Sequence, residues 1–260
     1  MRIHRAIILS LFVLFDCAAS HGQPSSKENF HIYLLMGQSN MAGRDTRQLA
    51  TQIDNPRVLA LNADGQWVVA RDPLHPKQGR IEPGTGPGIP FATEMLKADP
   101  AITIGLIPCA VGGSSLKAWV KGAEHYEKAV SRARTAAQAG VITGVLWHQG
   151  ETDTAKKETA ESYEARLTQM FGDLRQDLGL LNLPIVVGQL GDFLTLSPGK
   201  YPYADLVRGA IKHVPSVVPR VAYADSAGLN DKGDKLHFNA DAAKELGARY
   251  AKAMQALQKK

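Results

Sequence analysis

Apolar runs that suit buried strands alternate with stretches of helical periodicity along most of this chain. Strands of a parallel sheet are buried on both faces and form short continuous apolar runs, whereas surface helices repeat apolar residues three or four apart. This alternation is typical of a parallel sheet covered by helices on both faces. We therefore predict an α/β chain that folds as a single three-layer α/β/α sandwich with a parallel sheet. The expected strands are 32–36, 57–61, 67–70, 102–108, 144–147, 184–190 and 221–224, and the expected helices are 89–98, 123–138, 158–178, 204–213 and a closing helix capped by Asn239.

The first predicted strand ends at a glycine and is followed by a serine. Gly37 can adopt backbone conformations that other residues avoid, so the chain can turn sharply after Met36. Ser39 then lies just past the carboxyl end of the strand, where open α/β sheets bind their ligands. A serine hydroxyl in that place can act as a nucleophile if a base reaches it. The alternative is a serine that caps the next helix, because serine is a favoured N-cap residue.

A candidate base and its partner lie near the other end of the chain. Asp234 and His237 are three residues apart in a polar, glycine-containing segment that precedes the closing helix. Such a loop can place the carboxylate beside one imidazole nitrogen and leave the other nitrogen free to face Ser39. The alternative for this pair alone is an ordinary loop turn. The order serine, aspartate, histidine also occurs in α/β-hydrolases, but Met41 stands where their Gly-x-Ser-x-Gly turn has its second glycine.

Two later segments can receive the negative charge that forms during acyl transfer. Gly112 and Gly113 follow a predicted strand, and their backbone N–H groups can point into a site together with that of Ser39. Gln149 follows the next predicted strand and can add a side-chain donor to the same oxyanion hole. The alternative for each glycine-containing segment alone is a simple turn.

Two carboxylates compete for the role of partner to the histidine. Asp234 lies in the same loop as His237 and can reach the imidazole without help from distant packing. Glu151 follows the turn at Gln149 at a strand end and so faces the same cleft. We assign Asp234 as the partner and treat Glu151 as a possible site residue or alternative acid.

Four short motifs carry a resemblance to a known family: Gly-Gln-Ser-Asn-Met, Cys-Ala-Val-Gly-Gly-Ser-Ser, Trp-His-Gln-Gly-Glu-Thr-Asp and Asp-Lys-Leu-His-Phe. They occur in the order seen in SGNH-type hydrolases, which have a flavodoxin-like fold. More closely, the chain resembles the carbohydrate O-acetylesterases grouped with sialic-acid-specific acetylesterases and with acetylxylan esterases of carbohydrate esterase family six. The segment 86–92 is also similar to that group, and the resemblance runs from about residue 30 to residue 250.

The resemblance implies a role for each motif. Ser39 would be the nucleophile, His237 the base and Asp234 its partner, with Gly112 or Gly113 and Gln149 as oxyanion donors. SGNH hydrolases in general carry asparagine in place of this glutamine, but the closer acetylesterase group shares the glutamine.

The expected function is removal of O-acetyl groups from carbohydrate through an acetyl-serine intermediate. The expected substrate is acetylated xylan or a related plant polysaccharide, with O-acetylated sialic acid as the alternative. An alternative of another class is an exported glycan-binding protein without catalytic activity. Further candidates for substrate contacts are Gln38, Asn40 and His75, and Trp67 in the segment before His75 can also touch a sugar.

The N-terminus has the pattern of a secretory signal peptide. Residues 1–5 are basic, residues 6–15 are apolar and residues 17–20 are small enough for cleavage. We therefore expect a signal peptide at 1–19, a flexible lead-in at 20–29 and the SGNH-type esterase domain at 30–260. The enzyme would be secreted or periplasmic, and a lipoprotein anchored through Cys17 is the less favoured alternative.

Composition excludes several other classes of function. The formal net charge is +5 without long runs of like charge, so we predict no nucleic-acid partner and no stable membrane partner. The chain has two cysteines, Cys17 and Cys109, and no Cys/His cluster has the spacing of zinc ligands. We predict no metal and no cofactor, and the sequence predicts no oligomeric state.

Overall fold

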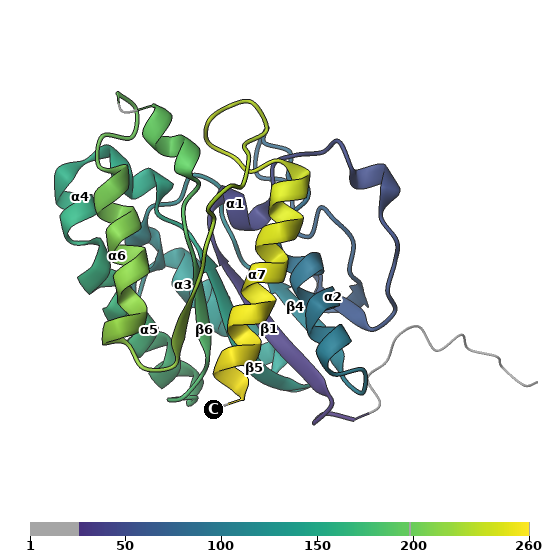
Figure 1. Cartoon of the computed structure of the whole chain (residues 1–260). Helices are drawn as coiled ribbons and strands as arrows, with labels where there is room; N and C mark the ends of the chain where they lie inside the picture. The colour runs from purple at the N-terminus through teal and green to yellow at the C-terminus, as the bar shows by residue number, and fades with distance from the viewer. Residues whose placement is uncertain (1–25, 198, 260) are drawn as a thin grey trace, which may run out of the picture.

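The structure is a computed structural model that describes residues 26–197 and 199–259 and contains a seven-stranded sheet (Figure 1). The predicted signal peptide, 1–19, and the first part of the predicted lead-in, 20–25, lie outside the described residues. The strand order is β3-β2-β4-β1-β5-β6-β7, and all neighbours are parallel except β3, which pairs antiparallel with β2. The strands are β1 (Phe30–Gly37), β2 (Val58–Leu61), β3 (Trp67–Val69), β4 (Thr103–Pro108), β5 (Val141–His148), β6 (Ile185–Gly188) and β7 (Val221–Ala224).

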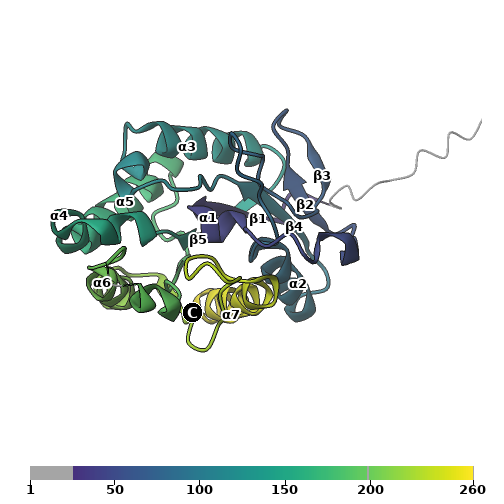
Figure 2. The same cartoon turned by 90° about the horizontal axis from the view of Figure 1, so that it is seen from above.

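Helices cover both faces of the sheet (Figure 2). On one face α2 and α7 pack against each other, and on the opposite face α3 lies beside α5, which also contacts α6. This arrangement confirms the predicted α/β/α sandwich with a mostly parallel sheet. No helix of the described ranges is long and apolar enough to cross a membrane. The helices are α1 (Ser39–Ala42), α2 (Gly88–Ala98), α3 (Glu124–Ala136), α4 (Lys157–Glu161), α5 (Tyr163–Leu178), α6 (Ala204–Val217) and α7 (Ala240–Gln258), with 3-10 turns η1 (Leu49–Thr51), η2 (Leu116–Trp119), η3 (Glu151–Ala155) and η4 (Asp192–Leu196).

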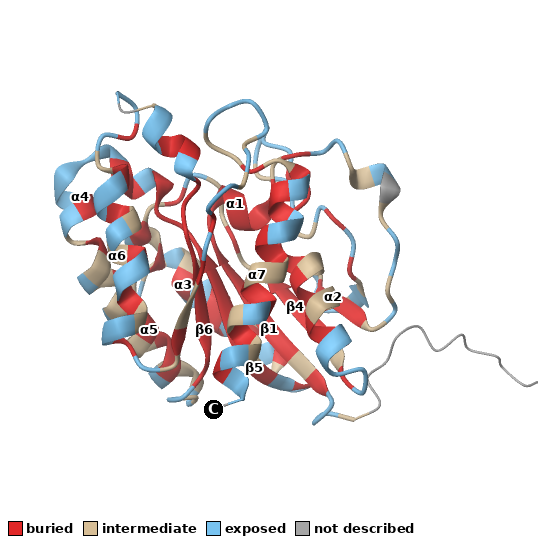
Figure 3. Ribbon diagram, in the orientation of Figure 1, coloured by how far each residue is buried: buried red, intermediate tan, exposed pale blue. Residues whose placement is uncertain are grey.

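The central strand is the most deeply buried part of the core. β1 pairs with β4 on one side and β5 on the other, and the side chains from Ile32 to Met36 have no exposed surface (Figure 3). Burying one large aliphatic side chain contributes about 1.5–3 kcal/mol relative to leaving it exposed. β1 is therefore a rigid base for the residues that follow it.

The predicted elements differ from the observed ones mainly at their ends. The helix predicted over 158–178 is two helices, because the chain breaks at Ser162 between α4 and α5. α6 continues past His213 to Val217 with Pro215 in its last turn, where a proline removes only one helical hydrogen bond. A short helix does follow β1, as the capping alternative for Ser39 implies, but Gln38 and not Ser39 is its N-cap residue. The short 3-10 turns are not predicted, because single turns depend on tertiary contacts rather than on periodicity.

The segments that carry the candidate residues lie at the carboxyl edge of the sheet. The chain leaves β1 toward β2 and β4 on one side, and β5, β6 and β7 lie on the other. Ligands of open α/β folds bind where the strand order reverses in this way. α1 and η3 begin at this edge, and the loop before α7 returns to it above α1 (Figure 1).

A glycine lets β1 and β5 meet at this edge. Gly37 has a φ of 126°, and a Cβ there would lie 2.0 Å from the carbonyl oxygen of His148 at the end of β5. The same carbonyl accepts a hydrogen bond from the backbone N–H of Gln38 at 2.8 Å. The two strand ends are therefore held closer than any side chain on Gly37 would permit.

Gly37→Ala is expected to lower the free energy of unfolding by about 2 kcal/mol or more, because it combines an unfavourable φ with a backbone clash. Gly172→Ala in α5 is the matched control, since a Cβ there meets nothing within 4 Å. Alanine in a helix is favoured over glycine by up to about 1 kcal/mol, so this control should be at least as stable as the wild type. Urea unfolding measures both variants, and a Gly37→Ala protein as stable as the wild type would contradict the argument.

Candidate active site

The structure brings Ser39, His237 and Asp234 together in a connected row. Ser39 begins α1 directly past the end of β1, and its Oγ lies 3.0 Å from Nε2 of His237. The other ring nitrogen of His237, Nδ1, lies 2.7 Å from Oδ2 of Asp234. A hydroxyl, an imidazole and a carboxylate in this order form the arrangement in which histidine removes the hydroxyl proton.

The loop that carries His237 is shaped by its own acidic residues. Oδ1 of Asp234 accepts hydrogen bonds from the backbone N–H groups of His237 at 2.8 Å and Leu236 at 3.0 Å. Oδ1 of Asp231 accepts from the N–H groups of Gly233 and Lys235 in the same way. Side chains of this kind commonly bond backbone groups two residues ahead and so fix a turn. The Asp-x-x-His spacing therefore both builds the loop and aligns the imidazole.

These contacts also set the charge states of the pair. Burial lowers the pKa of His237, against the effect of the Asp234 carboxylate, which acts to raise it. Partial burial acts to raise the pKa of Asp234, but the hydrogen bonds from the side chain and backbone of His237 outweigh it and hold that pKa well below its usual range. Near neutral pH the histidine is therefore an unprotonated base and the aspartate is charged.

Asn40 connects the histidine loop to the edge of the sheet. Its Nδ2 donates to the carbonyl of Leu236 at 3.1 Å, and its Oδ1 accepts from the N–H of Phe238 at 3.1 Å. Nδ2 also donates to Oε1 of Glu151 at 2.5 Å. Asn40 is 4% exposed and does not line the cavity at Ser39, so the structure gives it a positioning role in place of the predicted substrate contact.

Glu151 lines the cavity at Ser39 as a buried residue and does not contact His237. Burial raises its pKa to about 7, against the hydrogen bond from Asn40, which acts to lower it. Its Oε2 has no hydrogen-bond partner among the described residues, and Oε1 lies 3.7 Å from Nε2 of His148. Of the two carboxylates, the structure therefore places Asp234 against the imidazole and Glu151 against the asparagine that holds the loop.

Two backbone N–H groups remain available at the nucleophile. Within the described ranges, no acceptor is bonded to the N–H of Ser39 or to that of Gly113. A Cβ on Gly113, at a φ of 72°, would meet nothing within 4 Å, so this residue opens onto the cavity. The N–H of Gly112 is instead bonded to Oε1 of Gln78 at 2.7 Å. Of the two predicted glycines, Gly113 is the one that can donate to an oxyanion.

The structure does not bring the side chain of Gln149 to the cavity. Gln149 has no exposed surface, and its Nε2 donates to Oδ2 of Asp153 at 2.7 Å and to the carbonyl of Ser114 at 3.1 Å. Its Oε1 accepts a hydrogen bond from the hydroxyl of Tyr163. The prediction that this amide adds a donor to the oxyanion hole therefore does not fit the structure, because buried polar partners hold it.

Gln38 presents a side-chain amide to the cavity instead. Its Oε1 faces away from the cavity and accepts from Nε2 of Gln149 at 3.2 Å and from the N–H groups of Gly150 and Thr152 at 3.4 Å. Since the oxygen is directed at these donors, Nε2 lies on the other side of the amide, and it has no partner among the described residues. The sequence singled out Gln38 only as a candidate substrate contact.

The cavity at Ser39 has a volume of about 540 Å³, which is enough for a sugar unit beside an acetyl group. Besides Ser39, Gly113 and His237, its wall contains charged side chains that the sequence did not single out. They are Arg44, Glu82, Lys200 and Lys232. In the part of the chain that the structure describes, no group of three His, Cys, Asp or Glu side chains is placed to hold a metal ion.

Two other predicted sugar contacts lie elsewhere. His75 is 2% exposed and lines a separate cavity on the other side of the Gln78 side chain. Trp67 packs edge-to-face on Phe30, with ring centroids 4.7 Å apart, so it belongs to the core. Neither residue therefore lies at Ser39, and His75 is buried rather than on the surface.

A family model and a curated relative both match most of this chain. The model of the family described as carbohydrate esterase, sialic acid-specific acetylesterase, matches residues 29–256. A probable carbohydrate esterase of Arabidopsis thaliana is 36% identical over 242 residues, which cover 85% of this chain and 89% of the relative. The X-ray structure of that Arabidopsis protein matches with a TM-score of 0.78 at 33% identity, over 88% of this chain and 98% of its own.

Two more distant structures share the fold. The crystal structure of NanS matches with a TM-score of 0.72 at 17% identity, over 90% of this chain and 99% of its own. A carbohydrate acetylesterase from Xanthomonas citri matches with a TM-score of 0.66 at 22% identity, over 87% of this chain and 56% of its own. At these identities the likeness shows the fold alone.

The pH dependence of ester hydrolysis should report the state of His237. The imidazole must be unprotonated to accept the proton of Ser39, so kcat/KM falls as the pH drops through the pKa of His237. Because burial lowers this pKa, the midpoint is expected below the ordinary value of about 6.5. Initial rates with 4-nitrophenyl acetate across the pH range give the midpoint, and one above the ordinary value would contradict the geometry.

Asp234→Asn provides the companion measurement. Loss of the carboxylate removes the contribution that raises the pKa of His237, so the midpoint of the remaining activity should move further toward acid. The variant should also lose about 10⁴-fold in kcat, as when the aspartate of a serine triad is replaced.

Proposed function

Because this chain belongs to the sialic acid-specific acetylesterase family of carbohydrate esterases, and is therefore a carboxylic ester hydrolase, we propose that it releases acetate from O-acetylated carbohydrate through an acetyl-serine intermediate on Ser39. The observation that carries the mechanism is the row of contacts at the carboxyl edge of the sheet. Ser39 Oγ lies 3.0 Å from the imidazole of His237, which in turn lies 2.7 Å from Asp234.

The first half of the reaction forms the acetyl-enzyme. Nε2 of His237 takes the hydroxyl proton while Oγ of Ser39 attacks the acetyl carbonyl carbon. The carbonyl oxygen becomes an oxyanion, and we assign the N–H groups of Ser39 and Gly113 and the amide of Gln38 as its donors, because all three residues line the cavity. Asp234 keeps the remaining ring proton on Nδ1 and stabilises the imidazolium.

The second half releases the products. The imidazolium gives its proton to the sugar oxygen as the bond to the acetyl carbon breaks, and the deacetylated sugar departs. A water molecule then loses a proton to His237 and attacks the acetyl-serine. Collapse of the second oxyanion returns the proton to Ser39 and liberates acetate, so that neither a metal nor a cofactor enters the balance.

The substrate that we propose is acetylated xylan or a related plant polysaccharide. The volume of the cavity beside Ser39 supports a sugar unit as the alcohol part of the ester. O-acetylated sialic acid is the second candidate, because Arg44 and Lys200 in the same wall would suit its carboxylate. We also propose that the protein is exported, because residues 1–19 have the pattern of a signal peptide. The mass of the protein recovered from culture medium or periplasm tests this, since cleavage removes those residues.

A panel of acetylxylan, acetylated monosaccharides and O-acetyl sialic acid, with acetate release as the readout, tests the function and ranks the substrates. Ser39→Ala should abolish almost all release, because the nucleophile is lost while a small buried side chain replaces it without a clash. Unchanged thermal unfolding of this variant serves as the control for folding. A folded Ser39→Ala protein that still releases acetate would refute the mechanism, and a wild type inactive on the whole panel would favour a glycan-binding protein.

Gln38→Ala is expected to lower kcat about a hundredfold with little change in KM, because an oxyanion donor acts mainly in the transition state. Gln149→Ala is the matched comparison. It should mainly lower the melting temperature, since it leaves the buried Asp153 carboxylate without one of its donors. The reverse pattern, with kcat lost only in Gln149→Ala, would show that Gln149 supplies the donor after all.

A further inference from the structure

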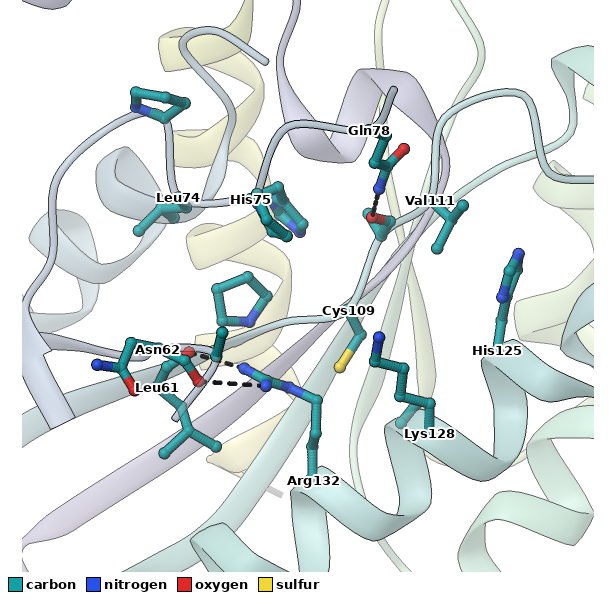
Figure 4. Close-up of a pocket in the computed structure, with 16 residues that line it drawn as sticks. Leu61, Asn62, Leu74, His75, Gln78, Cys109, Val111, His125, Lys128 and Arg132 are labelled. Carbon is teal, nitrogen blue, oxygen red and sulfur yellow. Dashed lines mark hydrogen bonds between the residues drawn. The ribbon is translucent and has the colours of Figure 1, made fainter. Parts of the chain in front are cut away.

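A second cavity, drawn in Figure 4, shares no lining residue with the catalytic one. Its volume is about 320 Å³, and it lies between the segment 73–78 and α3. Leu61, Leu74 and Val111 supply apolar walls. This volume is at the lower end of the range for small-molecule sites.

His75 lines this cavity with its hydrogen-bonding capacity unused. The residue is 2% exposed, and neither ring nitrogen has a hydrogen-bond partner among the described residues. The carbonyl of Leu35 lies near enough to act on its pKa, but burial dominates and lowers that pKa to about 3. The ring is therefore neutral, and protein atoms enclose both nitrogens, so His75 adds an uncharged wall to the cavity.

The charge of this cavity is positive. Lys128 and Arg132 are one helical turn apart on α3 and both line the cavity, as Figure 4 shows, whereas no aspartate or glutamate does. Lys128 forms no ion pair within the described ranges. Arg132 donates to the carbonyls of Leu61 at 2.7 Å and Asn62 at 3.2 Å, while its Nε is buried without a partner. Two cations without a carboxylate favour an anionic ligand.

The Gln78 side chain separates this cavity from the catalytic one. Gln78 donates to the carbonyl of Ala110 at 3.0 Å and accepts from the N–H of Gly112 at 2.7 Å. Val111 lines the second cavity, and two residues later Gly113 lines the catalytic one. The two cavities therefore border each other along the segment 111–113.

We propose that the second cavity is a subsite for a carboxylate-bearing sugar unit of the glycan that is deacetylated at Ser39. The carboxylate pairs with Lys128 and with the charge of Arg132, and the apolar walls receive the C–H face of the sugar ring. The subsite rests on the proposed function for its sugar chemistry, but its binding is measurable without turnover.

The test uses the full chain with the Ser39→Ala substitution, titrated by calorimetry with D-glucuronate and, separately, with D-glucose. Glucuronate is expected to bind about tenfold or more tightly than glucose, because a charge-assisted hydrogen bond contributes about 1.5–3 kcal/mol. Adding Lys128→Gln should remove most of this preference. Lys212→Gln, which changes an exposed lysine of α6 outside both cavities, is the matched control and should retain it.

Each outcome decides for or against the subsite. Equal binding of the two sugars, or no binding of either, overturns the proposal. A preference for glucuronate that survives Lys128→Gln also overturns it, because the anion would then occupy the catalytic cavity near Arg44. Failure of the proposed function is seen separately, as absence of acetate release by the wild type.

Discussion

The close approach of two strand ends determines where the whole site is built. β1 and β5 meet at Gly37, which has no side chain to separate them, and the next N–H is bonded to the carbonyl of His148. Ser39 consequently emerges at the first position of a helical turn, where its own N–H has no helical acceptor. The nucleophile and one of its oxyanion donors are thus products of the same backbone constraint.

Gln38 and Asn40, on either side of the nucleophile, position the groups around it. Gln38 turns its oxygen toward the chain after β5 and its nitrogen toward the cavity. Asn40 makes three hydrogen bonds that join η3 to both sides of His237. An alanine in place of either amide would leave buried partners unpaired, at a cost of about 1–3 kcal/mol for each such group. The Gly-Gln-Ser-Asn motif therefore stabilises the fold around the site and also supplies the nucleophile.

The sequence was sufficient for the sheet, because continuous apolar runs such as Ile32–Met36 depend only on burial on both faces. It was also sufficient for the pair Asp234 and His237, since a spacing of three within one loop fixes their contact locally. The direction of the Gln149 amide was not predictable, because the distant acceptors Gln38 and Ser114 help to determine it together with the nearby Asp153.

The position of His75 was not predictable either, because it also depends on distant parts of the chain. Its loop is polar and rich in proline, which predicts surface, but it folds over the end of β4 and buries the ring. No local pattern carries that information. Gln38 and Asn40 likewise acquire their roles only when the ends of β1 and β5 and the loop before α7 are together.

The nucleophile and the base are 198 residues apart, and this separation has a consequence for biosynthesis. A ribosome completes β1 and Ser39 early, whereas the loop with His237 and the helix α7 that packs on α2 emerge last. A nascent or C-terminally truncated chain therefore contains the hydroxyl but no general base. Esterase activity appears only when the final segment docks, which makes turnover itself a reporter of complete synthesis and folding.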